Sequence, residues 1–170
     1  MAFINKAEQV LSDFYIYLEK ERRFSSHTIQ AYKNDLSRFI SFLPNSISGL
    51  EKINRKTIRG FLAQEFDGGY TSKTVARRLA SIKSLFKYLK RSEQINKNPA
   101  FHVKSPKVPK SLPSFINQNV IDELMESPDD STEIGLRDRA ILEFFYSTGI
   151  RLSELIALNI GDVDPVKKMV

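Results

Sequence analysis

Residues 148–155 read Thr-Gly-Ile-Arg-Leu-Ser-Glu-Leu and join two helices that the sequence predicts. Apolar residues recur at helical spacing upstream, which predicts a buried helix that ends at about Ser147. Gly149 can adopt a positive φ angle and end this helix, and the apolar residues from Leu152 onward predict a second helix. This arrangement places Arg151 in the first turn of the second helix.

Arg151 and Glu154 are the candidate chemical groups of this stretch. A helix start disfavours a cation but attracts anions, and a guanidinium can clamp a phosphate with two parallel hydrogen bonds. Arg151 is therefore a candidate phosphate clamp, with Glu154 either holding its guanidinium in place or pairing with another cation. The alternative is a surface arginine with an intrahelical glutamate partner, because short motifs are weak hypotheses.

The residues at 147–158, followed by Asp-Val-Asp at 162–164, resemble the segment around the first catalytic arginine of the tyrosine recombinases, the Xer-type enzymes in particular. Segments at 26–39 and 74–89 resemble signatures of the core-binding domain of that family. The motifs fall in the family's order and cover nearly the whole chain. The resemblance implies a mainly α fold: a four-helix SAM-like core-binding domain, an extended linker, and the first helices of a truncated catalytic domain.

The amino-acid composition limits the classes of protein to which this chain can belong. The chain has 170 residues, a hydrophobic fraction of 41% that is enough to bury a core, and no cysteine, which excludes disulfides, a thiol nucleophile and thiolate metal sites. No apolar run approaches the ~20 residues of a membrane span. The amino terminus lacks the long apolar core of a signal peptide, so the cytoplasm is the default compartment.

Charge divides the chain into two parts. Residues 1–110 contain 21 lysines and arginines and 9 acidic residues, a net charge of +12, whereas residues 111–170 contain 5 and 11, a net charge of −6. A basic first half favours a polyanionic partner. Basic helical domains without such a partner also exist, so charge alone leaves both interpretations open.

Helical periodicity and proline positions predict the domain organisation. Four amphipathic helices, at about 6–22, 27–43, from 54, and 73–91, form a first domain at 1–98, with Phe66 among the residues expected to face inward. Residues 99–112 hold prolines among lysines and predict an extended linker. Residues 113–170 form the second domain, in which a short helix capped by Asn117 or Asn119 comes first and a strand is possible after Asp164.

The polar faces of the second and fourth predicted helices form the candidate DNA-binding surface. The fourth has no acidic residue between Ser72 and Ser92, although a solvated helix usually interleaves both signs. A like-charged face repels itself mildly, which fits contact with phosphate, and Gln or Asn on the second helix can read an adenine edge. A merely solvated face is the alternative for both. The candidate residues are His27, Gln30, Asn34, Lys73, Arg77, Arg78, Ser84, Lys87 and Arg91, with Arg38 and Ser41 on the same face of the second helix.

The resemblance also implies a mechanism and partners. In the family, a tyrosine hydroxyl attacks a phosphate held by two arginines. This breaks the DNA strand, leaving a phosphotyrosine link to one DNA end and a free 5′ hydroxyl on the other, and neither metal nor nucleotide cofactor is needed. Only the first arginine, Arg151, has a counterpart here, so we expect this chain alone not to cleave DNA. Expected partners are double-stranded DNA and homo- or hetero-recombinase copies (a tetramer on DNA in the family), with no membrane and no small-molecule substrate.

Several functions remain open at this point. The core-binding signature begins almost at Met1, which favours an Xer-type enzyme of chromosome-dimer resolution, with a mobile-element integrase of the same layout as the alternative. A DNA-binding module without catalysis and a helical scaffold with an incidental basic face are the other candidates. As a fragment, the chain is expected to leave apolar faces of the helices at 136–158 to pack on another copy, to swap, or to be poorly ordered.

Overall fold

The computed structural model describes residues 2–44, 47, 49–110 and 115–163, with side chains described from Ala7 onward. The chain divides into two compact units, Met1–Lys110 and Ser111–Val170, and each is described by itself. Every regular element of the described residues is helical, which confirms the predicted mainly α fold. None of these helices is long and apolar enough to cross a lipid bilayer.

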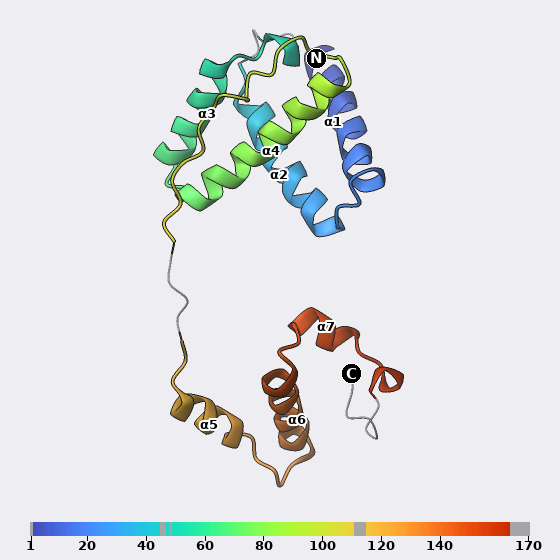
Figure 1. Ribbon diagram of the computed structural model, residues 1–170, viewed down its shortest axis with the longest axis vertical. Coiled ribbons are helices and arrows are strands. Elements are labelled where there is room, and N and C mark those ends of the chain that lie inside the picture. The colour runs from blue at the N-terminus through green and yellow to red at the C-terminus, as the bar shows by residue number, and fades with distance from the viewer. Residues whose placement is uncertain (1, 45–46, 48, 111–114, 164–170) are drawn as a thin grey trace. The chain divides into compact units, whose positions relative to one another are not determined.

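The first unit contains four α-helices, in which α4 packs against α2 and α3, and α1 packs against α2 (Figure 1). Three of these helices start at a side chain that caps them. Ser25, Asn54 and Thr71 each accept a hydrogen bond from the backbone N–H three residues on, at 3.3, 3.0 and 3.3 Å. The elements are α1 (Ala2–Lys20), α2 (Ser26–Phe42), the short 3-10 helix η1 (Leu50–Lys52), α3 (Arg55–Asp67) and α4 (Ser72–Arg91).

The core of the first unit is built around α4. Its predicted apolar stripe is buried along its whole length and meets aromatic side chains from the other three helices, including Phe14, Phe39 and Phe61. Each such side chain contributes about 1.5–3 kcal/mol when fully buried. Phe66, which was expected to face inward, is 43% exposed, because it lies beside residues 103–107 and not in the core.

The segment after α4 belongs in part to this core. Ala100 and Val103 are buried, and the Asn98 side chain accepts a hydrogen bond from the Ala100 N–H at 2.9 Å. Residues 103–107 then line a groove together with α3, and the chain runs back along that helix (Figure 1). The first residues of the stretch expected to be a linker are therefore anchored in the first unit.

The second unit contains α5 (Gln118–Glu126), α6 (Glu133–Thr148), α7 (Leu152–Ala157) and the 3-10 helix η2 (Ile160–Asp162), and α5 packs against α6. Asn117 caps α5, and Gly149 ends α6 with a φ of 65°, as predicted. Among the described residues of this unit, the large apolar side chains of Leu136, Leu152 and Ile156 are exposed. The strand expected after Asp164 lies outside the described residues.

Candidate nucleic-acid interface

Arg151 is the N-cap residue of α7, so it immediately precedes the helix and does not lie in its first turn as the sequence suggested. Its backbone N–H donates to Glu154 Oε2 at 2.9 Å, and its Nη1 donates to Oε1 at 3.0 Å. These bonds, the backbone one first, lower the pKa of Glu154. The Arg151 side chain is 81% exposed, so Glu154 orients a guanidinium that a phosphate can reach.

Two carboxylates lie in the interior of the first unit, where α2, α3 and α4 meet. Asp35 and Glu65 are only 2% and 1% exposed. Asp35 Oδ2 accepts hydrogen bonds from Arg77 Nη1 at 2.7 Å and from Ser81 Oγ at 2.8 Å, and Glu65 Oε1 accepts one from Arg38 Nε at 2.8 Å. A buried carboxylate is tolerated when it is paired and hydrogen-bonded in this way.

Arg78 lies between the two carboxylates. Its Nη1 forms an ion pair with Glu65 Oε2, its Nε lies 3.9 Å from Asp35 Oδ1, and its Cζ lies 3.9 Å from the centre of the Tyr70 ring. Burial, and then the charge of Arg38, lowers the pKa of Arg78.

The position of Arg78 differs from the sequence-based expectation, which placed it with the DNA contacts. Only 8% of the residue is exposed, because α4 turns this position toward the carboxylates of α2 and α3. The geometry fits a structural role in which Arg78 neutralises buried negative charge. We therefore leave Arg78 out of the contacts proposed below.

Arg38 and Arg77 are the outer members of the same network. Both side chains are about half exposed, and each is oriented by a buried carboxylate. Arg38 also lies over the Tyr70 ring, with its Cζ 4.7 Å from the ring centre. A guanidinium has five N–H donors, so one bond to a carboxylate leaves others free for phosphate. The contact between Asp35 and Arg77 places α2 and α4 candidates at one junction.

The remaining candidates lie on the same two helices. On α2, His27, Gln30 and Asn34 are exposed, and Gln30 Nε2 donates to Asn34 Oδ1 at 3.0 Å. On α4, Lys73 and Lys87 are exposed, and no carboxylate of the described residues lies within ion-pair distance of either lysine. Ser84 is half-buried, and Arg91 Nη2 lies 3.8 Å from Glu21 Oε2.

Sequence reasoning missed Asp35, Glu65 and Tyr70, which organise this junction. The available signal was an acidic residue next to the apolar stripe of each helix, since Asp35 precedes Leu36 and Glu65 precedes Phe66. An acidic residue at such a position is usually solvated, so the signal becomes clear only with the partner helix in place.

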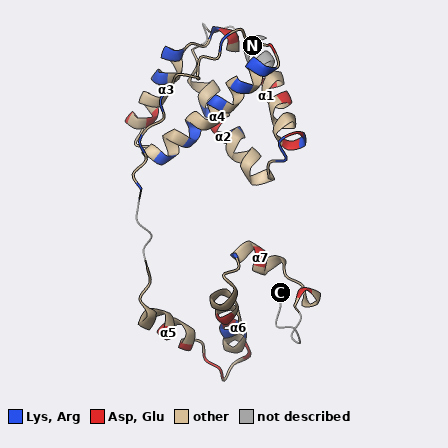
Figure 2. Cartoon of the chain, viewed as in Figure 1, with Lys and Arg blue, Asp and Glu red and all other residues tan. Residues whose placement is uncertain are grey.

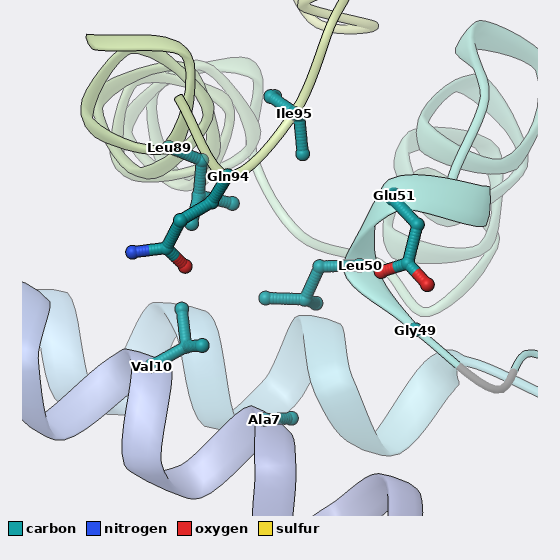
Figure 3. A pocket seen from close by; sticks show the side chains of 8 residues that line it. All are labelled: Ala7, Val10, Gly49, Leu50, Glu51, Leu89, Gln94 and Ile95. Atoms are coloured by element: carbon teal, nitrogen blue, oxygen red, sulfur yellow. The ribbon is translucent and has the colours of Figure 1, made fainter. Parts of the chain in front are cut away.

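A separate cavity of about 210 Å³ lies between α1, η1 and the residues that follow α4 (Figure 3). Val10, Leu50 and Leu89 point into it, with the polar side chains of Glu51 and Gln94 at its border. None of the described residues that line it is a cation, so these residues offer no positive charge to a phosphate.

Comparison with known families defines the class of protein. Residues 11–93 match the phage integrase N-terminal SAM-like domain, and residues 114–170 match the phage integrase family. The two matches cover both units of the chain in this order. The chain therefore belongs to the phage integrase family.

Curated relatives carry more specific names. The tyrosine recombinase XerC of Herpetosiphon aurantiacus is 42% identical over 92% of this chain and 52% of its own length. The tyrosine recombinase XerD of Oceanobacillus iheyensis is 34% identical over 92% of this chain and 53% of its own length. The chain thus spans about half the length of the curated relatives it matches.

Solved structures show the same fold. A lambda integrase dimer bound to a COC′ core site aligns with a TM-score of 0.71 at 19% identity, over 93% of this chain and 55% of that one. The Tn1549 transposon integrase in complex with a circular intermediate DNA aligns with a TM-score of 0.62 at 16% identity, over 91% of this chain and 49% of that one.

Proposed function

We propose that this chain is the DNA-binding part of a site-specific tyrosine recombinase that cuts and rejoins double-stranded DNA through a phosphotyrosine intermediate. The observation that carries the proposal is the match of both units to the phage integrase family, together with an accessible Arg151 in the second. Arg151 binds the phosphate whose ester bond to the DNA strand is broken, and it offsets the charge that develops on that phosphate, while Glu154 orients the guanidinium.

In this proposal, the first unit binds the DNA. Its contacts are candidate residues of α2 and α4 that are exposed or half-buried, with Arg77 and Arg38 presented by buried carboxylates. Preorganised side chains lose less conformational entropy on binding, which favours phosphate contact at this junction. The set is His27, Gln30, Asn34, Arg38, Lys73, Arg77, Ser84, Lys87 and Arg91.

None of the six tyrosines of this chain is a candidate nucleophile. Tyr32 and Tyr88 pack against the core of the first unit, and Tyr146 lies on α6. We infer that these 170 residues do not cleave DNA alone, and that cleavage needs residues of the longer relatives.

The proposed subtype is a Xer-type enzyme of chromosome-dimer resolution. Its support is that the relatives XerC and XerD are 42% and 34% identical, whereas the phage and transposon integrases are 19% and 16% identical. A mobile-element integrase is the second candidate, because those integrases share the fold. In this proposal, partner recombinase copies assemble with this protein on the DNA. We also infer that it acts on the chromosome in the cytoplasm.

A salt titration of duplex binding tests the DNA role. Lys73→Ala/Lys87→Ala removes two exposed cations of α4 without unpairing a buried carboxylate, and Lys20→Ala/Lys97→Ala removes two exposed cations elsewhere. By fluorescence anisotropy, wild type and control should show affinity that falls steeply with salt, and the α4 variant should lose about 1.8 from the log–log slope. Binding that is absent or insensitive to salt in the wild type would support the scaffold alternative.

A further inference from the structure

The first unit has a groove of about 690 Å³ between α3 and residues 103–107. Arg55 and Arg59 of α3 form one wall, and Lys104 and Lys107 form the other. The floor between these cations consists mainly of apolar side chains: Leu62, Ala63, Phe66 and Val103.

The positive charge of this groove is not balanced. None of the lining residues that the structure describes is acidic, and all four wall cations are exposed. In the described part of the chain, no carboxylate forms an ion pair with any of them. This contrasts with Arg38 and Arg77, whose carboxylate partners are buried. Uncompensated like charges repel one another, so an anionic ligand that enters the groove relieves that repulsion.

Both walls of the groove are held in place. Val103 is buried in the core at the start of the second wall, and Pro106 restricts the backbone between Lys104 and Lys107. Extended chain advances about 3.3 Å per residue, which separates these two lysines by about 10 Å. Arg55 and Arg59 lie one helical turn apart, with Cβ atoms about 6 Å from each other. Two rows of cations at these spacings fit the repeated phosphates of a nucleic-acid strand better than a single small anion.

We propose that this groove is a second phosphate-binding surface, which takes the backbone of duplex DNA adjoining the segment held by α2 and α4. The proposal rests on the proposed function and extends it to α3, on which no DNA contact has been placed. Ser72, the first residue of α4, lines the groove, and Lys73 of the α4 interface follows it in sequence. The two surfaces are therefore neighbours, and one duplex can lie across both (Figure 2 shows Lys and Arg on α3 as well as on α4).

The test compares Arg59→Ala/Lys104→Ala with Lys20→Ala/Lys97→Ala in the whole chain. Each variant removes two exposed cations, so net charge is matched. Anisotropy with duplexes of increasing length, at several salt concentrations, measures affinity and salt slope. We expect the groove variant to bind a long duplex roughly tenfold more weakly than the control at 0.1 M salt, with a slope smaller by about 1.8. On a duplex too short to reach past α4, the two variants should bind alike.

Three further results distinguish DNA binding in the groove from its alternatives. Arg59→Lys/Lys104→Arg keeps both charges and should bind as the wild type does, with circular dichroism checking that every variant folds. If the wild type binds DNA with a steep salt slope but the groove variant matches the control at all lengths, this inference is wrong while the proposed function stands. If the groove variant loses affinity only for a polyglutamate peptide, the groove is a docking surface for an acidic protein segment, and the DNA assignment is overturned.

Discussion

Replacing Glu65 by Gln tests whether the buried ion-pair network holds the first unit together. Glu65 is 1% exposed and pairs with Arg38 and Arg78. Glutamine keeps the shape and an acceptor for Arg38, so the main effect is on Arg78, a buried guanidinium that loses its nearest counter-charge. Unpairing a buried charge costs about 3–5 kcal/mol. Because Asp35 remains 3.9 Å from Arg78 Nε, we expect a loss near the lower end, about 3 kcal/mol.

Urea unfolding of the whole chain, followed by near-ultraviolet circular dichroism of tyrosine, measures this loss. The chain has no tryptophan, and five of its six tyrosines lie in residues 1–110, so the signal reports the first unit. A loss of about 3 kcal/mol corresponds to a decrease in Tm of roughly 12 °C or more for a domain of this size.

A double-mutant cycle separates the ion pair from packing. Arg78→Met removes the buried cation, so Glu65→Gln/Arg78→Met leaves neither charge unpaired and should be less destabilised than the sum of the single variants, by about 2 kcal/mol. The reasoning is refuted if Glu65→Gln unfolds within about 0.5 kcal/mol of the wild type, or if the two single effects simply add.

Three other expectations concern single side chains. Burial raises the pKa of Tyr15 to about 12 from its ordinary 10.0. The neutral form of Tyr15 therefore contributes stability that is fully present below pH 10 and is lost as pH rises through 12. Urea unfolding between pH 9 and 12 should show that the free energy of unfolding falls less steeply with pH in Tyr15→Phe than in the wild type. A Cβ on Gly135 would collide with the backbone of Asp129 in the preceding turn, whereas a Cβ on Gly161 would meet nothing within 4 Å. Gly135→Ala should therefore lose about 1–3 kcal/mol of hydrogen-exchange protection at the start of α6. The control variant Gly161→Ala should keep that protection. Ser81→Ala removes the hydroxyl that donates to buried Asp35 and should cost about 1.5–3 kcal/mol in urea unfolding, and an unchanged midpoint would contradict that role.

Local sequence signals predicted much of the fold because interactions between residues close in sequence determine where helices start and end. Asn117, one of the two residues expected to cap α5, does so, and Gly149 adopts the left-handed conformation expected at the end of α6. Apolar periodicity identified the buried face of α4 for the same reason, since a helix presents every third or fourth residue to one side.

Long-range pairing could not be predicted from the same signals. Arg78 lies next to Arg77 in sequence, and both read as surface cations, yet the packing of α2 and α3 buries one and leaves the other half exposed. Phe66 illustrates the converse, because its neighbour is a segment almost forty residues later, and no helical pattern encodes that contact. Helical periodicity therefore predicted the helices that carry the candidate residues, but it could not predict the environment of each side chain.

The unequal charge of the two units has a kinetic consequence under the proposed function. Arg151 belongs to the half of the chain with a net charge of −6, which a polyanion repels as a whole. Covalent attachment to a half with a net charge of +12 turns its encounter with DNA into an intramolecular event, which raises its effective concentration at the DNA. Release of the amino-terminal half from DNA would therefore slow chemistry at Arg151 by dilution alone, although no atom near that guanidinium had changed.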